Sequence, residues 1–237
     1  MPINLDSSFS VYHLVERLQN DDTQLLQDRK TMNTISYEIE NATLVDHAQT
    51  VIFSGFQRMS KFLPQIKRYT RIAQDAKAVY VFGIPDVEVP VIPNITYIPL
   101  EKHFQLAKEW FLVSFGAKFG SALATKELTN IDDPDENRQF RGVWTFDVSM
   151  VSILNEWLMR TVDAKTAILT EDEVNKQNQE LLIKNIYQRM MRRIGTNTLI
   201  PASYSNAKPK SDTQENLKVV IKTTLQPLVY SSKLIAF

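Results

Sequence analysis

The sequence contains no cysteine. Disulfides, thiolate zinc sites, cysteine-held iron–sulfur clusters and cysteine nucleophiles are therefore excluded, because each of them needs a sulfur atom. A bilin attached through a thioether and a flavin that forms a cysteine adduct are excluded for the same reason. Any recognition chemistry must come from other side chains.

Histidine and the glycine-based motifs are also scarce. The chain has three histidines, His13, His47 and His103, and none has a second and third ligand at metal-binding spacing. A phosphoacceptor role for His47 lacks the long helical dimerisation pattern that should precede it. The phosphate-cradling and hydrolase motifs GxxxxGK, GxGxxG and GxSxG do not occur. The sequence therefore predicts no metal, no cofactor and no enzyme activity.

No apolar run has the roughly 18 residues that a membrane span needs, and the best runs, residues 51–53 and 78–83, have the length of strands. The first 14 residues carry no lysine or arginine, so the pattern of a secretory signal is missing. With 43% apolar and 23% charged residues, the composition is typical of a globular protein. We expect a cytoplasmic location and no membrane contact.

Hydrophobic periodicity predicts a mixed α/β fold. Strand-like runs of β-branched and aromatic residues occur at 50–55, 78–83, 95–98, 110–115, 121–125 and 140–146. Helical spacing occurs at 11–18, 32–43, 64–77 and after Asp147, which can cap a helix. The strand–helix–strand order predicts a parallel first half, and the short loop 116–120 predicts an antiparallel second half. We expect a central mixed sheet of about six strands covered by helices.

The last third of the chain has a different pattern. The capping-box sequence at 170–173 and Gly195 predict one long helix over 171–194, followed by a flexible linker at 196–216. Residues 217–237 are compatible with strands or with a helix broken at Pro227. We therefore expect a sensor-sized domain over 1–165 and a helical appendage over 166–237.

Charge is unevenly distributed although the net charge is zero. Residues 181–237 contain nine lysines and arginines but only two acidic residues, Asp212 and Glu215. This basic appendage can dock on the acidic body of its own chain, bind an acidic partner protein or bind nucleic acid. Attraction alone does not separate the three.

Five short segments are informative together: residues 10–14 (SVYHL), 30–36 (KTMNTIS) with Ile39 and Glu40, 53–57 (FSGFQ) with Arg68 and Tyr69, 108–111 (KEWF), and 140–147 (FRGVWTFD). In sequence and in order they resemble the DICT sensory domain family. The resemblance covers about residues 7 to 162. It implies a bacterial sensory or signal-relay domain, of a kind frequent in cyanobacteria and often fused to histidine kinases, diguanylate cyclases or photoreceptors. This chain has no kinase or cyclase signature, so its output is expected to pass through such a signalling partner or through the appendage.

Within these segments, five residues are candidates for ligand binding: Gln57, Arg68, Tyr69, Trp110 and Trp144. Gln57 follows a buried strand, and ligands of such sheets gather beyond the carboxyl ends of parallel strands. The alternative for the two tryptophans is a place in the core. Arg68 has the alternative of pairing with Glu109.

The acidic cluster at residues 132–136 lacks the glycine and the spaced glutamate of an EF-hand loop, so we expect a solvated loop.

In the appendage, residues 175–180 are polar, which predicts a helix that projects from the body. An apolar stripe follows in its second half, and we expect it to form a homodimer interface: Ile183, Ile186, Met190 and Ile194. The alternative is that the stripe covers the sensor's own surface. A nucleic-acid-associated regulator is the second functional interpretation.

Overall fold

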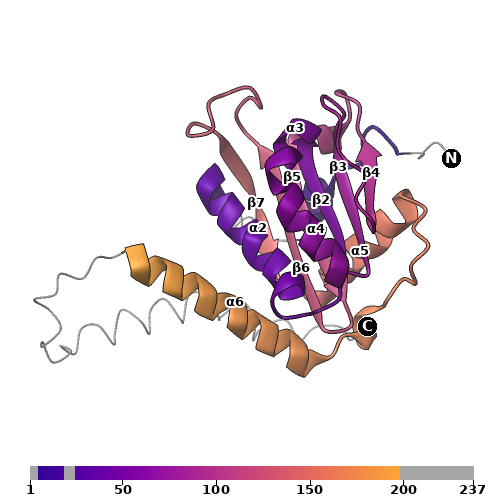
Figure 1. Cartoon of the computed structure of the whole chain (residues 1–237), viewed down its shortest axis with the longest axis vertical. Coiled ribbons are helices and arrows are strands. Elements are labelled where there is room, and N and C mark those ends of the chain that lie inside the picture. Colours follow the sequence, from indigo (N-terminus) through magenta and orange to yellow (C-terminus); the bar gives the residue numbers. More distant parts are fainter. Residues whose placement is uncertain (1–4, 19–24, 198–237) are drawn as a thin grey trace, which may run out of the picture. The chain divides into compact units, whose positions relative to one another are not determined.

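The computed structural model describes residues 5–18 and 25–197 (Figure 1). Met1–Arg193 form one unit, and Ile194–Phe237 form a second. The predicted linker at 196–216 lies almost entirely outside the described residues, and the terminal segment 217–237 lies wholly outside them. No helix in the described ranges is long and apolar enough to cross a membrane.

A single mixed sheet runs through the first unit. Its strands are β1 (Leu25–Asp28), β2 (Val51–Arg58), β3 (Ala78–Ile84), β4 (Ile95–Pro99), β5 (Glu109–Gly116), β6 (Phe119–Glu127) and β7 (Gln139–Thr145), in the order β1-β7-β6-β5-β2-β3-β4. β2, β3 and β4 are parallel, and the pairs from β2–β5 to β1–β7 are antiparallel. The six predicted strands and both pairing modes are confirmed. The short edge strand β1 was not predicted.

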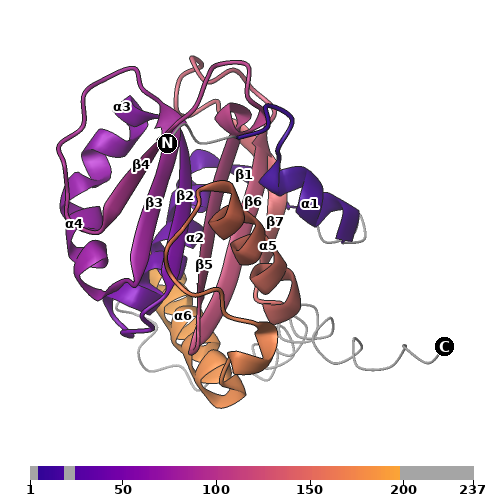
Figure 2. The ribbon, with the colours of Figure 1, turned by 90° about the vertical axis from the view of Figure 1, so that its right-hand side faces the viewer.

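Helices cover both faces of the sheet (Figures 1 and 2). They are α1 (Val11–Leu18), α2 (Arg29–Leu44), α3 (Met59–Phe62), α4 (Ile66–Asp75), α5 (Val148–Thr161) and α6 (Lys176–Asn197). α1 and α5 bury apolar residues on one face, while α2, α4 and α6 do so on the other. The predicted cap at Asp147 is confirmed, because its carboxylate accepts a hydrogen bond from the Met150 amide at 3.0 Å.

The start of the long helix differs from the prediction. Thr170 and Glu173 do form a capping box, but it closes only the short turn η4 (Glu171–Glu173). Val174 then takes an extended conformation and buries its side chain in the core. α6 begins at Lys176, after Asn175 accepts a hydrogen bond from the Asn178 amide at 2.9 Å, and it continues past Gly195 to Asn197. A core contact therefore overrides the local helix signal.

The prediction that the polar half of this helix projects from the body is wrong. The Gln179 side chain is buried and bonds the backbone of Gly120 twice, accepting from its amide at 2.8 Å and donating to its carbonyl at 2.9 Å. Leu182 and Ile186 are buried against the α2 and α4 face of the sheet. The first unit of the chain thus includes most of α6.

Two arginines near the end of α6 pair with acids of the same unit. Arg189 donates to Glu38 at 2.5 Å and to Asp46 at 2.8 Å, and Arg193 lies 3.0 Å from Glu38. Glu38 is fully buried on α2. For these two arginines, docking on the acidic body is the interpretation that the contacts support.

Candidate functional site

A pocket of about 400 Å³ lies at the carboxyl ends of β2 and β3. We call it the strand-end pocket. Its volume is within the range of small-molecule sites. The ends of β2 and β3, the turn η3 (Gln105–Lys108) and the loop after β6 form its walls. The lining residues are Gln57, Arg58, Ile84, Lys102, Ala107, Lys108, Glu127, Thr129, Asn130 and Ile131.

Gln57 lies in this pocket in a constrained backbone conformation. Its φ is 65°, in the left-handed region that non-glycine residues rarely adopt, and the β2–β3 register shifts between Gly55 and Arg58. This bulge directs the Gln57 side chain toward the β6–β7 loop, where it is buried. Unfavourable backbone conformations of this kind concentrate at functional sites.

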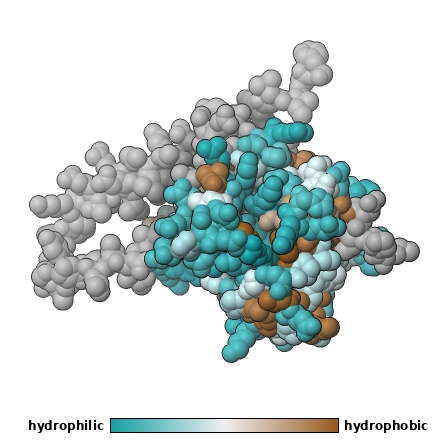
Figure 3. Space-filling view, turned by 90° about the horizontal axis from the view of Figure 1, so that it is seen from above, coloured by the Kyte–Doolittle hydropathy of each residue, from teal (hydrophilic) through white to brown (hydrophobic). Residues whose placement is uncertain are grey.

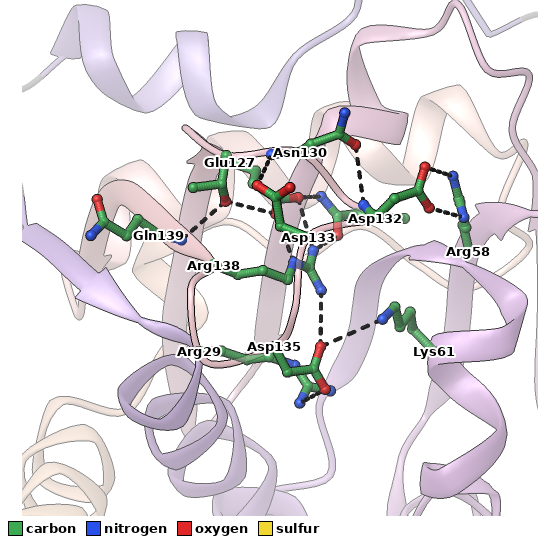
Figure 4. Close-up of polar contacts among 12 residues, drawn as sticks. Arg29, Arg58, Lys61, Glu127, Asn130, Asp132, Asp133, Asp135, Arg138 and Gln139 are labelled. Carbon is green, nitrogen blue, oxygen red and sulfur yellow. Dashed lines mark hydrogen bonds and ion pairs between the residues drawn. The ribbon is translucent and has the colours of Figure 1, made fainter.

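A buried charge network holds Gln57 in place. The Arg138 side chain is only 2% exposed. It donates to both carboxylate oxygens of Glu127, at 2.6 and 2.8 Å, and to the side-chain carbonyl oxygen of Gln57 at 2.6 Å. The Gln57 amide in turn donates to Glu127 at 2.8 Å. Figure 4 shows Arg138 and Glu127 at the base of the β6–β7 loop. Because each charge is paired and hydrogen-bonded, the network is rigid.

The acidic loop is tied to surrounding cations rather than only solvated. Asp132 accepts from both terminal nitrogens of Arg58, at 2.7 and 3.3 Å. Asp135 pairs with Arg29 at 2.5 Å and with Lys61 at 3.6 Å (Figure 4). The side chains of Asp132 and Asp135 are nevertheless 66% and 47% exposed, as expected for a solvated loop. Throughout the described ranges, no three His, Cys, Asp or Glu side chains gather into a possible metal site.

The lining of the strand-end pocket contains more cationic than anionic side chains: Arg58, Lys102 and Lys108 against Glu127. Glu127 is paired with Arg138 and Arg58 with Asp132, so Lys102 and Lys108 are the remaining charged residues of the lining. Lys102 and Lys108 are exposed, and no ion pair is found for either among the described residues. The α3 end of the sheet is largely hydrophilic, as the view from above shows (Figure 3). The lining charges that have no ion-pair partner among the described residues are therefore positive.

A second hollow lies between α2, α4 and the sheet, lined by residues that include Tyr69 and Trp110. Its volume of about 20 Å³ is sufficient for about one water molecule. Tyr69 bridges Ser54 at 2.7 Å and Glu40 at 2.8 Å, and Arg68 donates to Glu40. Burial raises the pKa of Glu40, although Arg68 opposes the shift, and burial also raises the pKa of Tyr69 well above its ordinary value. This crevice is a packed polar layer without room for a ligand.

The structure separates the five predicted site residues. Gln57 lines the strand-end pocket, while Tyr69 and Trp110 line the crevice and Arg68 pairs with Glu40 beside it. The Trp144 indole donates to Ser121 at 3.1 Å, outside both hollows.

The alternative pairing of Arg68 with Glu109 is wrong, because Glu109 instead accepts from Ser10 at 2.5 Å and from the Tyr12 amide at 3.1 Å. Burial raises the pKa of Glu109 to about 7. This carboxyl caps the start of α1 from inside the core.

Arg58, Glu127 and Arg138 were not among the site residues predicted from the sequence. A usable signal was present between the predicted strands 121–125 and 140–146, since Glu127 and Arg138 flank the intervening loop with opposite charges. Strand pairing brings such flanking positions together.

The model of one protein family, the "Sensory domain in DIguanylate Cyclases and Two-component system" (DICT), matches residues 8–128. The chain belongs to the DICT family. The match contains four of the five family-like segments and the pocket residues Gln57, Arg58, Lys102, Lys108 and Glu127. The fifth segment, residues 140–147, lies beyond it, as does Arg138. Neither a curated protein nor a solved structure matches this DICT chain.

Proposed function

We propose that this DICT protein is a non-catalytic sensor that binds a small ligand in the strand-end pocket and relays the signal by protein–protein contact. The observation that carries the proposal is Gln57. This residue holds a left-handed backbone conformation in the wall of a ligand-sized pocket, fixed by a buried ion pair. A buried charge pair is a poor source of stability, which favours a role in positioning.

Filling the pocket should prevent ligand binding. Ile131 is half-buried and lines the pocket, so Ile131→Trp is expected to occupy part of its volume. Native mass spectrometry of the full chain, purified from its own host, should show added ligand mass on the wild type and its loss from this variant. Leu128→Trp is the matched control, because Leu128 lies in the same loop but is exposed and does not line the pocket. Equal ligand retention by both variants would place the ligand elsewhere.

We propose that the signal leaves through α6, toward a kinase or cyclase partner of the kind with which DICT domains are associated, or toward a second copy of the chain. Of the four stripe residues proposed for a homodimer, Ile186 is 2% exposed and contacts the chain's own core, and Met190 packs partly against it. Ile183 is half-buried, and the side chain of Ile194 lies outside the described residues. The exposed apolar residues Leu181, Tyr187 and Met191 offer the surface for self-association.

The homodimer is testable with exposed residues alone. Changing Tyr187 and Met191 together to Glu should give a monomer by light scattering, while circular dichroism stays unchanged because neither side chain is in the core. Gln188→Glu, an exposed charge control on the same helix, should remain dimeric. A wild-type monomer at concentrations of tens of micromolar would end the dimer proposal.

A further inference from the structure

We infer that the strand-end pocket takes an anionic ligand bearing a carboxylate or phosphate group, and that Asp132 occupies the place of that group on Arg58 until the ligand arrives. The inference rests on the proposed function and adds to it the ligand class and the trigger. It follows from the geometry of Arg58, from the charge of the lining and from the exposure of Asp132.

Arg58 already binds one carboxylate, that of Asp132, with the geometry in which it would bind a ligand. Its two terminal nitrogens donate to the two oxygens of Asp132, at 2.7 and 3.3 Å. This fork-to-fork arrangement is how arginine recognises carboxylates and phosphates. Arg58 also lines the pocket and is the last residue of β2.

The remaining lining favours negative charge. Lys102 and Lys108 also line the pocket, and Glu127 is neutralised by Arg138. Asp86 lies within electrostatic reach of Arg58, but its two oxygens accept hydrogen bonds from Ser60 at 2.6 and 2.9 Å. A ligand anion would meet three cations of which only Arg58 has a carboxylate partner.

Asp132 is a suitable internal competitor because its replacement costs little. Its side chain is 66% exposed, so the released carboxylate returns to water at once. An exposed ion pair contributes only about 0.2 to 1 kcal/mol. Release of Asp132 would remove the tie between this loop and Arg58 at the end of β2. The hydrogen bonds inside the turn, from the Asn130 amide to Asp133 and from the Asp132 amide to Asn130, do not use the Asp132 carboxylate and remain. Asp135 keeps its own pairs with Arg29 and Lys61. Ligand binding thereby detaches a surface loop from the end of β2.

The test is titration calorimetry of the full chain with inorganic phosphate and with succinate, which separate the two sources of anion, and with glucose as a neutral probe. Asp132→Asn should bind phosphate or succinate about two- to fivefold more tightly than the wild type, the factor that an exposed ion pair of up to about 1 kcal/mol represents. Arg58→Gln should weaken it by about tenfold or more, since a charged hydrogen-bond donor is lost. Asp133→Asn removes the same charge from the same loop without touching Arg58, so it should match the wild type.

Hydrogen exchange supplies the second readout. Adding whichever anion binds should increase amide hydrogen exchange at residues 130–133 and decrease amide hydrogen exchange at Arg58. The inference is overturned if Asp132→Asn and Asp133→Asn bind alike, or if the loop becomes more protected. A host ligand that carries no anionic group would also overturn it, yet would leave the proposed function standing. Retention of the ligand by Ile131→Trp, by contrast, would remove the proposed function itself.

Discussion

Replacing Arg138 with Ala is expected to destabilise the fold by about 3 to 5 kcal/mol, because it leaves a buried carboxylate without its partner. The Glu127 side chain is only 4% exposed and takes both of its charged hydrogen bonds from Arg138. Gln57 would lose the donor to its carbonyl oxygen in the same step. Equilibrium urea unfolding of the full chain measures the change.

The control for this variant is Arg160→Ala. Arg160 also pairs with a glutamate, Glu156 at 2.7 Å, but its side chain is 68% exposed. Such a pair on a helix surface is worth about 0.3 to 0.5 kcal/mol. If Arg138→Ala cost no more than Arg160→Ala, the buried network would not be what holds the strand-end pocket.

The second large effect is a pH dependence that originates at Glu109. Its pKa is raised by burial from an ordinary value of 4.5 to about 7, against the opposing hydrogen bonds from Ser10 and Tyr12. The folded state therefore holds this proton more tightly than the unfolded state. The stabilisation is fully present below pH 4.5 and is lost as the pH rises to about 7, a change of about 3 kcal/mol.

Glu109→Gln should remove this contribution, because an amide does not titrate. The difference in unfolding free energy between the wild type and the variant is expected to change by about 3 kcal/mol between pH 4.5 and pH 8 and to be constant above that. Glu40, whose pKa is also raised by burial, remains in both proteins and cancels in the comparison. A difference that is flat across this range would mean that Glu109 titrates normally.

The sequence predicted the sheet because its signals are local. The buried runs at 51–53 and 78–83 are β-branched and aromatic, and Gly55 and Gly83 lie near their ends. Gly55 is required where it stands, since an added Cβ would lie 2.3 Å from the Phe111 ring of the neighbouring strand. Asp147 caps its helix through residues three positions away. Signals that depend only on residues a few positions apart in the sequence predict the same structure before and after the chain folds.

The sequence-based predictions were wrong where contacts between residues far apart in the sequence determine the local structure. The helix start shifted to Lys176 because Val174 is buried in the core, and the polar residue Gln179 is buried because Gly120 offers it a backbone partner. Gln57 lies near the end of β2 and lines the strand-end pocket. Its partners Glu127 and Arg138 lie 70 and 81 residues further along the chain, so only the folded sheet brings them together.

Native mass spectrometry of the wild-type protein from its host tests the central proposal most directly. The strand-end pocket, with its fixed Gln57 and its cationic lining, predicts one small molecule added to the mass of each chain. Chains that carry only their own mass, under conditions in which the sheet remains folded, would contradict the sensor proposal.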